Sequence, residues 1–103
     1  MNSENLKNPH PGEILKEHFL KEFDMSQNAL AKDIAVPANR IHSIIRGQRR
    51  VTADTDLRLC RYFGLSEGYF LRLQIAYESM EAKRSLGRQL LRIHPYHGNE
   101  KRA

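Results

Sequence analysis

The feature that most constrains this fold is Pro37, which lies between two short segments whose apolar residues have helical spacing. Proline pushes the residue before it out of the α region, so a helix cannot run through Val36, yet proline is tolerated at a first helical position. Ser26 is placed to cap the preceding helix, which we expect to end near Ile34. The sequence therefore predicts two helices joined by a corner of about three residues, the second running from Pro37 to Arg46.

Similar start and stop signals predict one helix upstream of this pair and one downstream. Pro11 suits a first helical position, and the apolar spacing that follows predicts a helix from Pro11 to Phe23. Gly47 can supply the left-handed residue that ends the third helix. Thr52 is placed to cap a fourth helix, and Gly64 to end it. The residues of this fourth helix that we expect to face the core are Leu57, Cys60 and Phe63.

A fifth helix is predicted to restart at Ser66 and to extend to Leu91, although Gly87 weakens its last third. Its aromatic and Met residues favour core packing, with a subunit interface as the alternative. The fold class is therefore all-α, with five helices and an extended last helix. We expect a single domain over residues 9–92, with flexible tails at 1–8 and 93–103. The aromatic and Met residues of the fifth helix that are expected to pack in the core, or alternatively at a subunit interface, are Tyr69, Tyr77 and Met80.

Charge favours an acidic partner, because 17 Lys and Arg oppose 12 Asp and Glu and give a formal charge of +5. Nucleic acid comes first among such partners, ahead of an anionic membrane. No apolar run approaches the roughly 20 residues that cross a bilayer, and no leader pattern is visible, so we expect a cytoplasmic protein without a membrane partner. The single cysteine, Cys60, lies in an apolar pattern and is expected to be a small core residue.

The stretch between Asp33 and Asp54 contains no carboxylate and spans both the corner and the third helix. On a helical wheel its isoleucines group on one side, and its polar residues group on the other. A short, polar, cationic outer face of this kind suits the major groove of DNA, whose donors and acceptors Asn, Ser and Arg can match. The arginines of this stretch are Arg40, Arg46, Arg49 and Arg50.

The expected DNA contacts divide into two groups. Residues on the outer face of the third helix are expected to contact base edges, and residues at the two ends of the unit are expected to bind phosphates. The predicted base contacts are Ala38, Asn39, Arg40 and Ser43. The predicted phosphate contacts are Gln27, Arg46, Gln48, Arg49 and Arg50.

Other functional classes lack their usual signatures. No nucleophile stands beside a base and no Gly-rich phosphate loop is present, so neither an enzyme nor a cofactor is expected. His94 and His97 have no third ordered ligand near them in the sequence, so no metal site is expected. A series of basic residues at helical spacing is expected to be solvated, with an operator backbone or an acidic partner as alternatives. These are Lys83, Arg84, Arg88 and Arg92.

The pattern resembles a known family, the HigA-type or VapI-like antitoxins of the lambda-repressor-like (XRE) helix-turn-helix group. The resemblance covers most of residues 9–78. Phe70 stands where that family often has Trp, and Arg72 where it often has Asn. The matching residues are 10–15 (HPGEIL), 26–27 (SQ), 29–31 (ALA), 36–37 (VP), 39–41 (NRI), Gly47, 49–55 (RRVTADT), 57–59 (LRL), 63–64 (FG), 73–74 (LQ) and Tyr77.

The resemblance implies a lambda-repressor-like fold and a homodimer that represses its own operon at a palindromic operator. It also implies neutralisation of a co-encoded toxin, commonly an mRNA-cleaving ribonuclease of the HigB/RelE-like type. Two alternatives stand beside this hypothesis. One is a stand-alone helix-turn-helix regulator without a toxin partner, and the other is an interaction module whose basic face binds an acidic protein.

Overall fold

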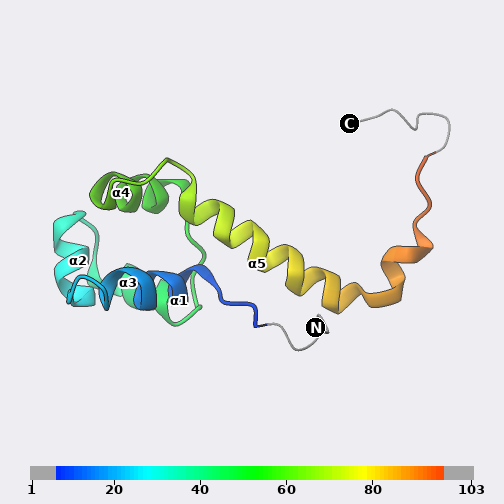
Figure 1. Cartoon of the computed structure of the whole chain (residues 1–103), viewed down its shortest axis with the longest axis horizontal. Helices are drawn as coiled ribbons and strands as arrows, with labels where there is room; N and C mark the ends of the chain where they lie inside the picture. The colour runs from blue at the N-terminus through cyan, green and yellow to red at the C-terminus, as the bar shows by residue number, and fades with distance from the viewer. Residues whose placement is uncertain (1–6, 97–103) are drawn as a thin grey trace.

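The computed structural model describes residues 7–96, and within that range the chain forms helices and connecting turns without a strand. The first and the last α-helix are each followed directly by a short helical segment of another type. Counted together with these segments, the elements correspond to the five expected helices of an all-α fold (Figure 1). In chain order they are α1 (Pro11–Leu15), the π-helical turn η2 (Lys16–Leu20), α2 (Gln27–Asp33), α3 (Ala38–Ile45), α4 (Ala53–Phe63), α5 (Tyr69–Leu86) and the 3₁₀ helix η3 (Gly87–Arg92).

The helix caps expected from the sequence are present. The Ser26 hydroxyl accepts a hydrogen bond of 3.0 Å from the Ala29 amide at the start of α2, and Thr52 caps α4 in the same way. Gly47 and Gly64 both have left-handed backbone angles, with φ of 76° and 71°. These helix ends could be predicted because each cap depends only on neighbouring residues.

The first helix is shorter than expected, ending at Leu20 instead of Phe23. The chain turns through Asp24, whose φ is 51°, and the Met25 amide bonds back to the Leu20 carbonyl at 2.9 Å. Phe23 stacks on the Phe63 ring with a centroid separation of 5.8 Å while remaining 57% exposed. Phe23 thus reaches its apolar partner from a turn, so its helical spacing from Phe19 did not require a helix.

The starts of two other helices also differ from expectation by a few residues. Pro37 is the N-cap of α3, with ψ of 141°, so the helix begins at Ala38. The last helix begins at Tyr69, after Gly68, and not at Ser66 as expected. Gly68 has φ of 90°, and its amide donates to the Asp56 carboxylate at 2.7 Å. The carboxylate of Asp56, which is distant in sequence, therefore binds the start of this helix.

The core lies where α1 to α4 meet the first turns of α5. Cys60 is buried, as expected, but Leu57 is 47% exposed, and the expectation that it faces the core was wrong. Asp56 takes an inward position on α4 instead, because its carboxylate serves the start of α5. The buried apolar residues are Leu15, Leu20, Leu30, Ala31, Ile34, Val36, Ile41, Ile44, Val51, Leu59, Cys60 and Phe70.

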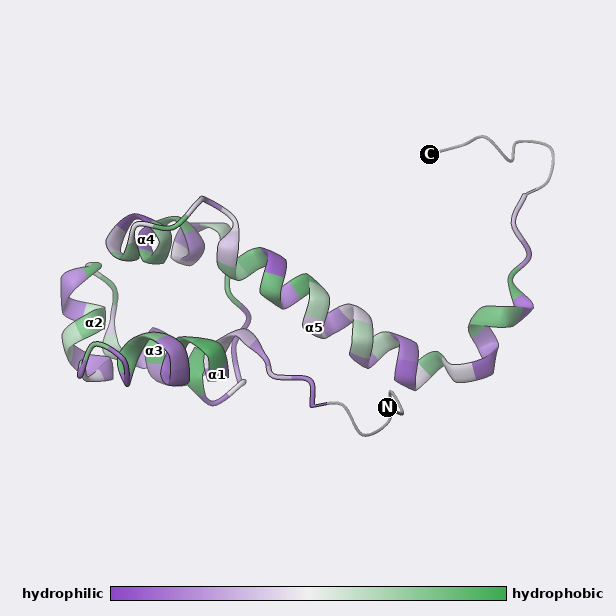
Figure 2. Ribbon diagram, viewed as in Figure 1, coloured by the Kyte–Doolittle hydropathy of each residue, from purple (hydrophilic) through white to green (hydrophobic). Residues whose placement is uncertain are grey.

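The second half of α5 projects from this body, giving extents of 53 × 30 × 23 Å (Figure 1). Only Phe70 and Gln74 of α5 are buried. The α-helix ends at Leu86, and Gly87, with φ of 53°, leads into η3. Apolar and polar residues alternate along the projecting part without any covering element in Figure 2. Within the described range no helix is long and apolar enough to cross a membrane.

The expected domain limits at residues 9 and 92 stay predictions. Asn8, placed in the expected N-terminal tail, donates from its side-chain amide to the Tyr77 carbonyl at 2.9 Å and to the Glu81 carboxylate at 3.0 Å. Residues 1–6 and 97–103 lie outside the described part, and His97 is among them.

Candidate nucleic-acid interface

The corner between α2 and α3 is closed by backbone hydrogen bonds. The Val36 amide donates to the Ala31 carbonyl at 3.0 Å, and the Ala35 amide donates to the Lys32 carbonyl at 3.2 Å. This pair of bonds forms a Schellman motif, which requires a left-handed residue, here Ala35 with φ of 60°. Such a conformation is unfavourable for a residue with a Cβ. The tight corner thus forms despite a local conformational cost.

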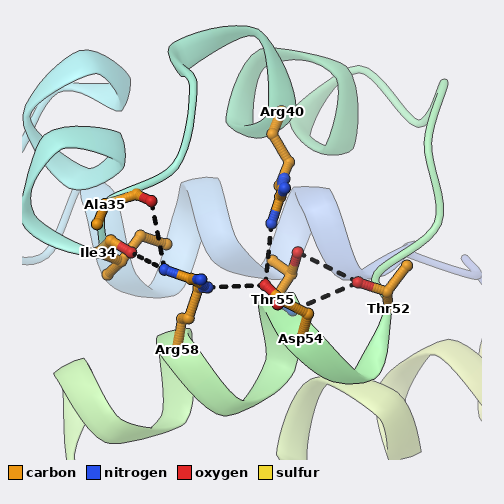
Figure 3. Close-up of polar contacts among 7 residues, drawn as sticks. All are labelled: Ile34, Ala35, Arg40, Thr52, Asp54, Thr55 and Arg58. Carbon is orange, nitrogen blue, oxygen red and sulfur yellow. Dashed lines mark hydrogen bonds and ion pairs between the residues drawn. The ribbon is translucent and has the colours of Figure 1, made fainter.

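Residues of α4 hold this corner from outside the helix pair (Figure 3). The Arg58 guanidinium donates to the carbonyls of Ile34 and Ala35, at 2.8 and 3.3 Å, and so satisfies the C-terminal end of α2. Its Nε donates to the Asp54 carboxylate at 2.7 Å. The hydrogen bond from Arg58 is the largest cause that holds the pKa of Asp54 below its ordinary value, with a smaller contribution from Arg40. Asp54 and Arg58 therefore act together to fix the corner.

Arg40 belongs to the same network. Its Nη1 donates to the Asp54 carboxylate at 3.0 Å, so the side chain runs from α3 toward α4 (Figure 3). Of the four residues expected to contact bases, Arg40 alone forms an ion pair within the described residues. Its role in base contact stays a prediction, and in the DNA-free chain its guanidinium links α3 to α4.

The inner side of α3 is anchored as the sequence predicted. Ile41 and Ile44 are buried, and Ile45 is half-buried against the core. Gly12 at the start of α1 approaches so closely that a Cβ there would collide with the Ile44 carbonyl oxygen. At its C-terminal end α3 is closed by a Schellman motif, in which the Gln48 amide donates to the Ser43 carbonyl at 2.9 Å. The helix is thus fixed along its length.

The outer side of α3 remains open to solvent. Asn39 and Arg46 are exposed, and Ala38 and Ser43 are half-buried. The imidazole of His42 lies 3.0 Å from the Asn28 side-chain oxygen and links α3 to α2. Gln27, expected to contact phosphate, is half-buried at the first position of α2. The polar edge expected to enter the groove is therefore accessible in this structure.

The segment after α3, residues 48–50, is exposed and carries two adjacent arginines. Arg50 forms a bidentate pair with Glu78 of α5, with Nε and Nη2 lying 2.6 and 3.0 Å from the two carboxylate oxygens. This hydrogen-bonded pairing raises the pKa of Arg50 and lowers that of Glu78. Arg49 is exposed and forms no ion pair within residues 7–96.

Beside these arginines the chain forms a hollow of about 310 Å³ at the start of α4. The hollow brings together three arginines expected to contact DNA and the N-terminal end of α4. The N-terminus of α4 and Arg49 favour anions at this surface, whereas Arg40 and Arg50 are already paired with the carboxylates of Asp54 and Glu78. Its lining residues are Arg40, Arg49, Arg50, Thr52, Asp54 and Thr55.

Several residues that build the interface were not anticipated from sequence. Gln74 is buried, and its side-chain amide both accepts from the Val51 N–H at 2.6 Å and donates to the Val51 carbonyl at 2.9 Å. A polar residue at a helical spacing shared with Phe70 and Tyr77 was the available signal for this role. No local pattern pointed to the partners of Asp56, Arg58 or Glu78.

A metal centre was not expected, and no group of three or more His, Cys, Asp or Glu side chains in the described part is placed to bind one. The expectation rested on His94 and His97, and His97 lies outside the described residues.

Solved proteins with this architecture are found among antitoxins. A structure of the Pseudomonas aeruginosa antitoxin HigA with the higBA promoter has a TM-score of 0.80 and 41% identity, covering 86% of this chain and 98% of that one. An addiction module antidote protein of the HigA family from Coxiella burnetii has a TM-score of 0.82 and 41% identity, covering 88% of this chain and all of the other.

The sequence comparisons agree with the structural ones. Virulence-associated protein I of Dichelobacter nodosus is 52% identical over 69 residues, which are 67% of this chain and 64% of that relative. This chain therefore spans less than two thirds of that relative's length. The family model described as Helix-turn-helix matches residues 17–70, more than half of the chain. The chain thus belongs to the helix-turn-helix family of DNA-binding proteins and has the fold of the HigA-type antitoxins.

Proposed function

We propose that this chain is a sequence-specific transcriptional repressor that acts as the antitoxin of a toxin–antitoxin pair. One observation carries the DNA-binding part of this proposal. The outer edge of α3 is solvent-accessible on a helix whose opposite side is buried, and an exposed cationic segment follows it directly. A rigid helix of this kind, flanked by cations, has the form of a major-groove recognition helix.

The proposed roles divide by chemistry. Asn39 and Ser43, with Ala38 beside them, contact base edges, because their short polar or apolar side chains match groove donors, acceptors and methyl groups. Gln27, Arg46, Gln48, Arg49 and Arg50 bind phosphates and set the register of the helix. Arg40 contacts a base only after its guanidinium leaves Asp54, which lies 3.0 Å away in the DNA-free chain.

The antitoxin part of the proposal draws support from the structural neighbours. The Pseudomonas aeruginosa neighbour is an antitoxin solved with promoter DNA, and the Coxiella burnetii neighbour is an addiction module antidote. By analogy this chain forms a homodimer on a palindromic operator, with two α3 helices about 34 Å apart or a multiple of that. Its partner toxin is an mRNA-cleaving ribonuclease, and the antitoxin itself performs no catalysis.

The experiment that tests DNA recognition is selection of bound duplexes from a random library, followed by titration at two salt concentrations. Asn39→Ala is expected to change the selected sequence, because it removes a base contact. Arg49→Ala is expected to weaken binding to all duplexes alike and to reduce the salt dependence, because it removes a phosphate contact. Arg92→Ala, an exposed arginine of η3, is the matched control for loss of charge.

The outcomes separate the candidate functions. Wild-type binding that does not weaken as salt rises would contradict DNA binding and favour an interaction module. If Asn39→Ala left sequence preference intact while Arg49→Ala changed it, the assigned roles would be wrong. Sequence-specific binding by a chain that does not bind or inhibit the product of the adjacent reading frame would indicate a stand-alone regulator.

A further inference from the structure

The pair formed by Arg50 and Glu78 joins the cationic segment after α3 to a helix that otherwise leaves the DNA-binding unit. Both carboxylate oxygens of Glu78 accept hydrogen bonds from the Arg50 guanidinium, at 2.6 and 3.0 Å. The two residues lie 28 positions apart in sequence, so this contact exists only in the folded chain. One of the cations available for phosphate is therefore already paired with a carboxylate.

Contacts of α5 next to Glu78 keep Arg50 close to its carboxylate. Gln74, one helical turn earlier on the same side, binds both backbone groups of Val51, the residue next to Arg50. The segment after α3 is thus held against α5 by an amide at one turn and a carboxylate at the next. Because Val51 is fixed and buried, Arg50 stays within reach of Glu78.

We infer that Glu78 competes with DNA phosphate for Arg50 and so restrains sequence-independent binding to duplex DNA. This inference rests on the proposed DNA-binding function and adds a residue that limits its affinity. Binding without sequence preference comes almost entirely from phosphate neutralisation by Lys and Arg. The Glu78 carboxylate occupies two donors of the Arg50 guanidinium and so offsets most of the charge that Arg50 could offer to phosphate. Its own negative charge also repels the phosphates of the duplex.

The pair is suited to exchange because it is exposed. The side chains of Arg50 and Glu78 are 67% and 40% accessible, and water weakens ion pairs at such sites. A phosphate presented in a favourable position can therefore replace the carboxylate. Arg49, which has no such partner in the described part of the chain, is the cation that engages phosphate without any exchange.

The test is the affinity of the full chain for a random-sequence duplex across a salt series. Glu78→Gln is expected to tighten binding about three- to fivefold and to steepen the salt dependence by up to about 0.9 in log–log slope, as one more cation becomes available. Glu81→Gln is the matched control. It makes the same change in charge one turn later on α5, where the carboxylate contacts Asn8 and, at 3.6 Å, Arg84 instead of Arg50.

Further variants separate a direct effect from a general one. When Arg50 is replaced by Gln, the Glu78→Gln change is expected to tighten duplex binding by no more than the Glu81→Gln control does. Glu78→Asp, which keeps the carboxylate, is expected to lie close to wild type. Circular dichroism of each variant verifies the fold.

The inference would be overturned if Glu78→Gln weakened binding, which would make Glu78 an orienting residue for Arg50. It would also be overturned if Glu78→Gln and Glu81→Gln had equal effects, or if the gain persisted without Arg50. A wild-type chain that does not bind the duplex in a salt-dependent manner would instead overturn the proposed function, and this inference with it.

Discussion

The body of the molecule and its projecting C-terminal part contain similar residues in opposite environments. Leu30 in α2 is completely buried, whereas Leu91 in η3 is 78% exposed. The same contrast holds for Ile41 of α3 and Ile93 after η3, which are 0% and 71% exposed. Apolar residues are thus abundant in both parts, but only the body has elements that cover them.

The difference shows that α5 is held at its beginning and not along its length. Asp56, Gln74 and Glu78 connect its first turns to the rest of the chain, and Asn8 binds the Tyr77 carbonyl. Beyond this region the described residues contribute no buried side chain. Because helix stability in proteins comes mainly from packing, the two parts are expected to respond differently to equivalent substitutions.

The largest expected contrast comes from removing one leucine side chain in each part. Leu30→Ala is expected to lower the free energy of unfolding by about 2–5 kcal/mol, because it leaves a cavity in the core. Leu91→Ala is expected to change it by less than about 0.5 kcal/mol. Urea denaturation of both variants measures the difference. Comparable losses would mean that the projecting part is packed in solution.

The next contrast concerns the carboxylate that begins α5. Asp56 is 1% exposed and accepts hydrogen bonds from the amides of Gly68, Phe70 and Leu71, at 2.7, 2.9 and 3.2 Å. Asp56→Ala is expected to cost about 2–3 kcal/mol, because these amides lose their acceptor where water has little access.

The control for Asp56→Ala is Glu81→Ala on the projecting half of α5, expected to stay within about 0.5 kcal/mol of wild type. Hydrogen exchange at the amides of Phe70 and Leu71 should accelerate in Asp56→Ala alone. Unchanged protection there would contradict the capping role.

A smaller effect, an increase in the free energy of unfolding, is expected when the alanine at the corner is replaced by glycine. Ala35→Gly should raise the free energy of unfolding by about 0.5–1 kcal/mol, because glycine accepts the left-handed conformation of the corner without a Cβ penalty. Ala82→Gly, in the exposed part of α5, should reduce local helix content with little effect on global unfolding. Denaturation and circular dichroism measure the two responses. Destabilisation by Ala35→Gly would contradict conformational strain at Ala35.

The smallest effect expected is a pH dependence of the stability that comes from a carboxyl group of the body, Asp54. The pKa of Asp54 is lowered from 3.8, chiefly by the hydrogen bond from Arg58. A carboxyl whose folded-state pKa is depressed adds stability above its unfolded-state value and loses it as the pH falls through the depressed one. The stability difference between wild type and Asp54→Asn should therefore shrink below about pH 4. A difference independent of pH would exclude the ion pairs as its source.

Much of the fold could be predicted because its signals are local. Ser26, Thr52, Gly47 and Gly64 each act through neighbouring backbone groups, and all four are where the sequence placed them. The isoleucine stripe of the third helix likewise needed only helical periodicity. The errors at Phe23, Ser66 and Leu57 arose where a contact from elsewhere in the chain decided the local conformation, whereas the start of α3 differs from expectation by one residue, at Pro37.

The candidate site was predictable as a set of residue types and not as a set of contacts. Asn39, Ser43 and Arg46 were expected on an open edge of α3, and the structure leaves them accessible to different degrees. The pairing of Arg40 with Asp54 and of Arg50 with Glu78 had no sequence signature. Partners 14 and 28 residues apart meet only after the helices pack.

By itself, then, the amino-acid sequence determined the order of the helices, the corner at Val36 and Pro37, and the acid-free surface beside it. Caps, proline geometry and apolar periodicity act over a few residues, so they need no knowledge of the fold. The tertiary structure alone decided which arginines are already neutralised and where α5 leaves the core. Those outcomes depend on long-range hydrogen bonds and ion pairs, whose geometry exists only once α4 and α5 have packed against the helix pair.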